Sequence, residues 1–158
     1  MNRLPLLCGL LFFAFSEPTV MKAQLRIDVV QDISFGSFYA GANGGKITIT
    51  PEGIRATTGT IVPLATSTET PAIFEVRSLT LFPRRVHIVF PASVYLTRSG
   101  GSERMIVTNF KSNKPSDSFW ASLLTQTVNV GATLNVQGPS ANPPGKYTGT
   151  FSVIFAYE

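Results

Sequence analysis

The residues of this chain that could titrate or attack a substrate are few and widely spaced. His87 is the only histidine and lies inside an alternating apolar run, which indicates a side chain on the less buried face of a strand. A lone histidine cannot supply the three or four ligands of a zinc site. No serine stands in the Gly-x-Ser-x-Gly pattern of a hydrolase elbow. We therefore expect no catalytic residues, no cofactor and no metal ion.

The carboxylates also form no motif. They are spread over different segments, at Asp28, Asp32, Glu52, Glu69, Glu75, Glu103 and Asp117. A pair that converges in three dimensions could still serve glycoside hydrolysis, which uses two flanking carboxylates. Enzymatic activity is therefore the last of three hypotheses. A structure in which these side chains point separately to solvent would count against it.

The only cysteine, Cys8, lies within an apolar run from Leu4 to Phe15 that follows Arg3. This run is too short to cross a bilayer, which takes about 20 residues, and it has the length of a signal-peptide core. Leu7 precedes Cys8, whereas a lipidated cysteine needs a small residue there. We predict a signal peptide over residues 1–23, cleaved after Ala23, which would leave no cysteine behind.

The predicted leader implies export to the periplasm, the cell surface or the medium, with no membrane span after cleavage. The alternative is an uncleaved N-terminal anchor. Residues 24–158 have the size of a single domain. The chain has 13 basic and 9 acidic residues, and the basic ones are scattered. Nucleic-acid-binding proteins usually gather such charge into a patch, so we expect no nucleic-acid partner.

Period-two alternation of apolar residues runs through the chain and predicts half-buried strands. Strands are expected over residues 25–36, 46–50, 60–64, 72–79, 85–90, 93–98, 104–110, 128–136 and 146–158. Residues 41–45 and 99–102 are predicted to be glycine-rich hairpin turns. Residues 119–124 fit either a helical turn or a strand. The pattern predicts an all-β fold, an immunoglobulin-like antiparallel β-sandwich.

Aromatic side chains raise a second functional hypothesis. Tyr39, Tyr95 and Trp120 could form a stacking platform for sugars, which would make the protein a monomeric surface or periplasmic binding module. The alternative is that these rings belong to the core of the sandwich.

The C-terminal strand is the most specific feature of the sequence. Its odd positions are apolar or glycine, at Tyr147, Gly149, Phe151, Val153, Phe155 and Tyr157. A strand at the end of a chain can pair along a free sheet edge of another protein. Subunits of chaperone–usher pili are similar here, since they carry a glycine before their last strand and a penultimate aromatic residue. Gly145 and Tyr157 hold those places.

A wider resemblance spans most of residues 24–158. It rests on residues 33–38, 44–49, 51–55, 58–59, 130–134 and 145–151. These segments resemble the secreted domain of unknown function family 4402 of Gram-negative bacteria, which is similar to pilin and spore-coat U-type domains. The resemblance implies a pilin-like β-sandwich.

Pilin kinship implies donor-strand exchange, in which a strand from a neighbour fills an incomplete sandwich. A periplasmic chaperone first provides that strand, and a like subunit then replaces it. The candidate donor is residues 24–31, with Leu25, Ile27 and Val29 as pocket-filling side chains. The first hypothesis is therefore a fimbrial subunit, whose assembly residues are those three together with Gly145, Tyr147, Phe151, Val153, Phe155 and Tyr157. The alternative is that residues 24–31 are simply the first strand of a complete sandwich.

Overall fold

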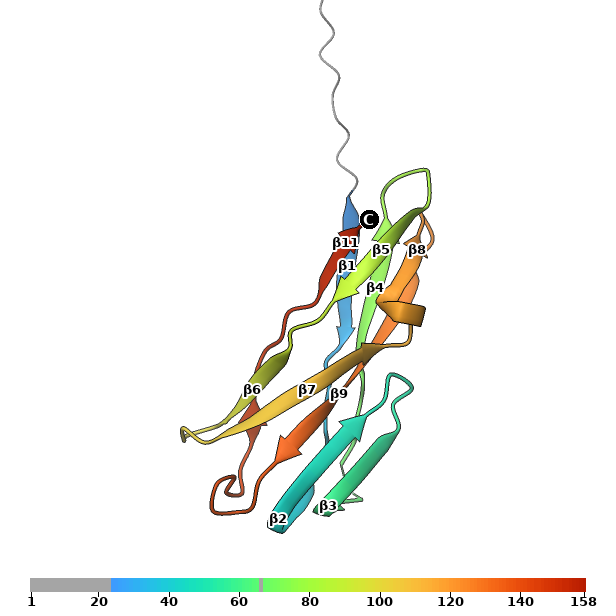
Figure 1. Cartoon of the computed structure of the whole chain (residues 1–158). Helices are drawn as coiled ribbons and strands as arrows, with labels where there is room; N and C mark the ends of the chain where they lie inside the picture. The colour runs from blue at the N-terminus through green and yellow to red at the C-terminus, as the bar shows by residue number, and fades with distance from the viewer. Residues whose placement is uncertain (1–23, 66) are drawn as a thin grey trace, which may run out of the picture.

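The computed structural model describes residues 24–65 and 67–158, and these form an all-β structure with antiparallel sheets (Figure 1). The sequence-based prediction of an all-β fold is confirmed. The predicted signal peptide and Cys8 lie outside the described residues. Within the described ranges, no helix is long and apolar enough to cross a membrane.

The strands form two sheets. The larger one, a half-barrel, contains β1 (Leu25–Gln31), β2 (Phe38–Ile49), β3 (Arg55–Pro63), β4 (Ala72–Ser78), β6 (Ser93–Arg98), β7 (Arg104–Ser112), β9 (Gln126–Val136) and β10 (Tyr147–Thr148). The smaller one contains β5 (Arg84–Val89), β8 (Ser118–Ala121) and β11 (Ile154–Tyr157). A short 3-10 turn, Pro115–Asp117, precedes β8.

Strand β9 organises the larger sheet. It pairs with β4 along its first half and with β2 and β7 further on, while β1 lies outside β4, and β6 and β10 lie outside β7. Its alternate residues Val128, Val130, Ala132, Leu134 and Val136 are all buried. Strict alternation in so long a strand buries one continuous apolar face, which fixes its register against three neighbours.

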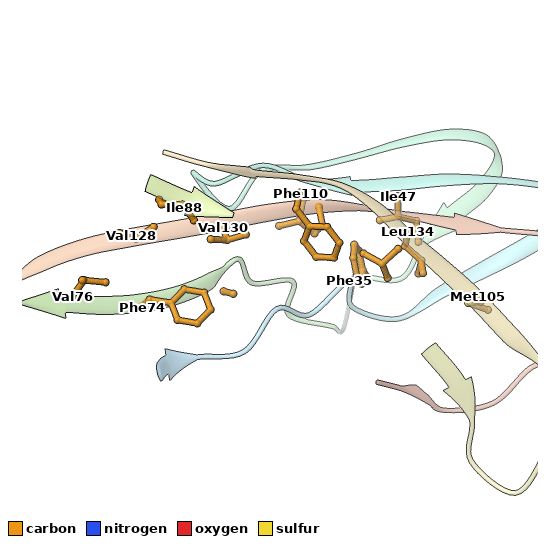
Figure 2. Packing of buried hydrophobic residues seen from close by; sticks show 14 of the residues in the cluster. Phe35, Ile47, Phe74, Val76, Ile88, Met105, Phe110, Val128, Val130 and Leu134 are labelled. Carbon is orange, nitrogen blue, oxygen red and sulfur yellow. The ribbon is translucent and has the colours of Figure 1, made fainter. Parts of the chain in front are cut away.

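Both sheets contribute to one core. The larger sheet provides Ile47, Val76, Val128 and Leu134 among others, and the smaller sheet provides Val86 and Ile88. Figure 2 shows that Phe35 points into this core beside Leu134 and Phe110, although it precedes the first residue of β2. The core therefore continues beyond the strands into the connecting segment at residues 32–37.

The glycine-rich segment at residues 41–45 is not a hairpin turn, so that prediction was wrong. It lies inside β2, where the register against β3 shifts between Ala40 and Gly45. The backbones crowd here, since a Cβ atom at Gly44 or Gly45 would collide with the chain opposite. Glycine is therefore needed here because the backbones pack closely within a bulged strand, and not because the chain reverses direction.

The predicted C-terminal strand over residues 146–158 is interrupted, which corrects a second prediction. Tyr147–Thr148 pairs with β6 in the larger sheet, and Ile154–Tyr157 pairs with β5 in the smaller sheet. Residues 149–153 cross between the sheets without belonging to either. The alternation nevertheless persists, because the odd residues from Phe151 to Tyr157 are half-buried and the even ones are exposed.

The ambiguous segment after the polar loop is β8 followed by a turn rather than a helix. Ser118–Ala121 pairs with β5, and Trp120 lies opposite Arg85 with its indole exposed. The hairpin predicted at residues 99–102 is present, and it connects β6 to β7.

Candidate assembly site

A long groove opens on one side of the larger sheet. Residues 32–40 form one wall, and residues 143–151 form the other. Its volume is about 1180 Å³, and more of its lining is apolar than polar. Apolar lining side chains include Ile33, Phe35, Phe38, Leu96, Met105, Val107, Leu134 and Phe151. A groove of this volume and lining suits an extended apolar segment.

The floor of the groove is the core itself. Met105, Val107 and Leu134 are almost completely buried, and each still contributes atoms to the groove lining. They come from β7 and β9, the paired strands at the centre of the sheet. Any occupant of the groove would therefore pack directly against core residues.

The groove stays open because neither wall is a regular strand along its whole length. On one side, Ser34 makes an isolated bridge with Thr70, and β2 starts only at Phe38. On the other side, residues 149–151 carry no ladder to a neighbouring strand. Backbone N–H and C=O groups that lack a ladder partner are available to pair with an added strand.

The predicted assembly residues of the C-terminal segment pack inward. The Phe151 ring stacks on Phe110, with centroids 5.1 Å apart, and the Phe155 ring meets Phe74 edge-on at 5.8 Å. Val153 also packs against the core. These side chains hold the C-terminal segment to its own domain, and only Tyr147 and Phe151 among the predicted aromatic residues also line the groove.

The start of this segment is fixed by two contacts. The Tyr147 hydroxyl donates to the carbonyl oxygen of Pro143 at 2.8 Å, and burial raises the pKa of this phenol. Gly145 lies against the side chain of Arg98, where a Cβ atom would come within 2.9 Å of Cδ. Gly145 therefore allows the groove wall to approach β6 closely.

Arg98 is itself held by a two-point ion pair. Its Nε and Nη2 donate to the two carboxylate oxygens of Glu103, at 2.8 and 2.9 Å. Hydrogen bonds from Arg98 lower the pKa of the Glu103 carboxyl to about 2. The fork-like geometry makes this pair stronger than an ordinary surface pair, and it fixes the β6–β7 turn beside the groove wall.

The remaining predicted assembly residues, those of the candidate donor segment, lie in β1. Leu25, Ile27 and Val29 face Ser78, Val76 and Phe74 of β4. Ile27 is 41% exposed and Val29 is 64% exposed, because β1 is the outermost strand of its sheet. The structure therefore brings residues 24–31 together with β4 of the same chain, and separates them from the groove formed by residues 32–40 and 143–151.

Sequence reasoning found one wall of this groove and missed the other. Residues 32–36 were predicted only as the end of a strand over residues 25–36, and residues 33–38 only as part of a family resemblance, although Ile33 and Phe35 alternate with polar residues beyond the end of β1. That alternation just outside a regular strand was the available signal. The floor residues carried no such sequence signal, because a core residue that also faces a groove has the same sequence pattern as any other core residue.

The other residues considered for catalysis, metal binding or sugar stacking lie on different segments of the chain. The His87 imidazole is half exposed, with Nδ1 3.7 Å from Glu158 Oε1. Among the described residues, no three His, Cys, Asp or Glu side chains gather as metal ligands would. Tyr39, Tyr95 and Trp120 are all exposed, but they belong to β2, β6 and β8.

The acidic residues serve several local contacts. Glu69 pairs with Arg55, and Asp117 accepts hydrogen bonds from Ser112. Asp28 and Glu75 face each other across β1 and β4 on an exposed surface, next to two arginine side chains. This surface is shallow and charged.

The sequence model of the family described as Domain of unknown function (DUF4402) matches residues 25–157. The chain belongs to this family. The match covers nearly all of the residues that the structure describes, so the groove walls, β1 and the C-terminal segment are all parts of the DUF4402 domain. No curated protein and no solved structure matches the chain.

Proposed function

We propose that this DUF4402 protein is an exported structural subunit that assembles by strand addition, as a pilin-like building block of a surface fibre or a periplasmic assembly. In this proposal the two sheets form an immunoglobulin-like sandwich that lacks one strand. The observation that carries it is the apolar groove of about 1180 Å³ between residues 32–40 and 143–151.

Strand addition fits the chemistry of this groove. Its floor is apolar, and its C-terminal wall carries backbone groups without a ladder at residues 149–151. An added strand would gain main-chain hydrogen bonds along that wall and place alternate side chains over Met105, Val107 and Leu134. The proposed export rests on the signal-peptide pattern of residues 1–23. The occupant would come first from a periplasmic chaperone and then from a like subunit.

The donor segment that the sequence favours is residues 24–31, whose alternate residues Leu25, Ile27 and Val29 match such a floor. Within its own chain this segment already pairs with β4. Donation to a neighbour would therefore exchange β1 from its own sheet into another groove. The exposure of Ile27 and Val29 favours that exchange, because little apolar burial holds them in place.

A peptide with the sequence of residues 24–31 tests the proposal. The protein is expressed from the full chain, purified and heated with and without the peptide. Binding to the folded state alone stabilises by about 2.7 kcal/mol when the peptide is present at 100 times its Kd, which raises the melting temperature by several degrees.

Two controls make the result specific. A peptide with serine at the three apolar positions should give no shift. Ala40→Phe places a ring in the groove, because Ala40 lines it, and this variant should lose the response to the native peptide. A wild-type protein that stays monomeric and shows no peptide-dependent shift would contradict the proposed function.

A further inference from the structure

Strand β1 is the exposed edge of the larger sheet. It pairs with β4 on one side, and no other strand within residues 24–65 and 67–158 pairs with its outer side. Every residue from Arg26 to Val30 is exposed. Three of these five are aliphatic, and an aliphatic edge strand with unpaired backbone groups is a template for another strand.

The hydrogen-bond pattern shows which backbone groups face outward. The amide of Leu79 donates to the carbonyl of Gln24 at 3.0 Å, in register with the Leu25–Ser78 pair that follows. Hydrogen-bonded and non-bonded pairs alternate along an antiparallel ladder. Arg26 and Asp28 therefore point their N–H and C=O groups toward β4, whereas Leu25, Ile27 and Val29 point theirs to the open edge.

The charges on β1 are poorly matched by β4. Arg26 lies directly opposite Arg77, and Asp28 lies directly opposite Glu75. Like charges in directly opposed positions destabilise a strand pair. The Arg26 guanidinium instead contacts Asp28 of its own strand, with Nε 3.0 Å from Oδ2, and both side chains are more than half exposed. Both charged groups are thus accessible to a partner that approaches the open edge of β1.

We propose that two copies of this chain pair through β1 around a two-fold axis at Ile27. Antiparallel pairing centred there places Ile27 opposite Ile27 and Leu25 opposite Val29, so that all outward-facing backbone groups of these residues form hydrogen-bonded pairs. On the other face, Arg26 of each copy meets Asp28 of the other in the closer, non-hydrogen-bonded position. The edge is thus complementary to itself in backbone pattern, apolar side chains and charge.

Other two-fold registers lack this match. An axis at Arg26 or Asp28 would place a charge opposite its own copy, which is repulsive. An axis at Val29 would include Val30, where the register against β4 shifts, so the run of regular strand would be broken. Only the axis at Ile27 uses the regular segment from Leu25 to Val29 in full.

This inference rests on the proposed function only in treating β1 as an assembly element. In strand donation β1 would leave its own sheet, whereas in the pairing proposed here it stays paired with β4. It does not involve the groove. Groove binding is measured with the peptide and with Ala40→Phe, whereas edge pairing is measured with charge variants of β1. A negative result for groove binding therefore does not contradict edge pairing, and a negative result for edge pairing does not contradict groove binding.

Sedimentation equilibrium of the protein expressed from the full chain tests the pairing. The wild type should dimerise in a concentration-dependent way. Arg26→Asp and Asp28→Arg should each weaken the dimer about tenfold or more, because each converts both cross-copy ion pairs into like-charge pairs. Each change also places an opposite charge across from Arg77 or Glu75 of β4, so the melting temperature should not fall.

Mixing the two variants gives the decisive result. The carboxylates of one variant then face the guanidinium groups of the other, and an equimolar mixture should form a heterodimer with an affinity close to that of the wild type. The double variant Arg26→Asp/Asp28→Arg should regain self-association. Arg104→Asp, an equal charge change at an exposed residue of β7, should leave the dimer unchanged.

Four outcomes would overturn the proposal, and the first three concern β1 directly. These are a wild-type protein that stays monomeric at every concentration reached, single variants that dimerise as well as the wild type, and a mixture that does not recover association. A dimer that Arg104→Asp weakens as much as Arg26→Asp does would also overturn it, because the contact would then depend on general charge rather than on β1.

Discussion

The hydroxyl group of Tyr157 donates a hydrogen bond to the carbonyl oxygen of Gln24, at a distance of 3.2 Å. This contact joins the first described residue to the penultimate residue of the chain. The same hydroxyl lies 3.0 Å from Ser78 Oγ, which is completely buried at the end of β4. The Arg84 guanidinium lies over the Tyr157 ring, 5.1 Å from its centroid. The penultimate aromatic residue thus fastens β11 to the β1–β4 pair.

Replacing Tyr157 by Phe should lower the free energy of unfolding by about 1 kcal/mol, because a typical intramolecular hydrogen bond contributes roughly this amount. Ser78 keeps Thr80 Oγ1 as a second partner at 2.8 Å, so its hydroxyl is not left without any bond. Urea denaturation measures the change. Tyr39→Phe is the control, since Tyr39 is 62% exposed and surface changes usually stay within about 0.5 kcal/mol. Equal effects of the two variants would contradict this role of Tyr157.

Acid should weaken the fold in part through Glu103. Its folded-state pKa of about 2 lies below the ordinary value of 4.5. A lowered carboxyl pKa stabilises the fold fully above the ordinary pKa and loses that contribution as the pH falls from about 4.5 toward 2. The difference in unfolding free energy between the wild type and Glu103→Gln should therefore shrink over this range. Glu52→Gln, at an exposed turn residue, should show no such convergence.

Gly44 and Gly100 form a matched pair for testing close packing in β2. Both have positive φ, 63° and 78°, so alanine costs about 1–2 kcal/mol of backbone strain at either position. A Cβ at Gly44 would also collide with the carbonyl oxygen of Val136, whereas nothing lies within 4 Å at Gly100. Gly44→Ala should therefore destabilise by about 1–3 kcal/mol more than Gly100→Ala in chemical denaturation. Similar losses would mean that the strand moves freely to make room.

The groove floor should behave as core. Leu134 is 2% exposed and lies in the centre of the sheet, so Leu134→Ala should cost about 2–5 kcal/mol of stability. Leu124 is 77% exposed, and Leu124→Ala should cost less than about 0.5 kcal/mol. Thermal and urea unfolding of both variants measure the difference. A cost below 1 kcal/mol at position 134 would show that the floor is not well packed.

The sequence by itself determined the all-β class and much of the core. Period-two alternation is a local property, and it placed residues such as Val128 and Val130 on a buried face. It also placed the hairpin at residues 99–102, because glycine at a chain reversal is a local signal. The inward direction of Phe151 and Phe155 follows from the same alternation.

Only the tertiary structure decided where the C-terminal segment changes sheet, and with it the groove. Over residues 147–157 the odd positions are apolar or glycine throughout, with Ile154 the one large apolar residue at an even position, so no local signal marks the crossing at residues 149–153. The crossing depends on which distant strands pair with each half, β6 for Tyr147 and β5 for Phe155. The same holds for β1, where the meeting of Arg26 with Arg77 depends on a register set across 51 positions of sequence, 77 minus 26. Alternation shows which face of a strand is buried, but long-range pairing decides which strand lies beside it and which edge stays open.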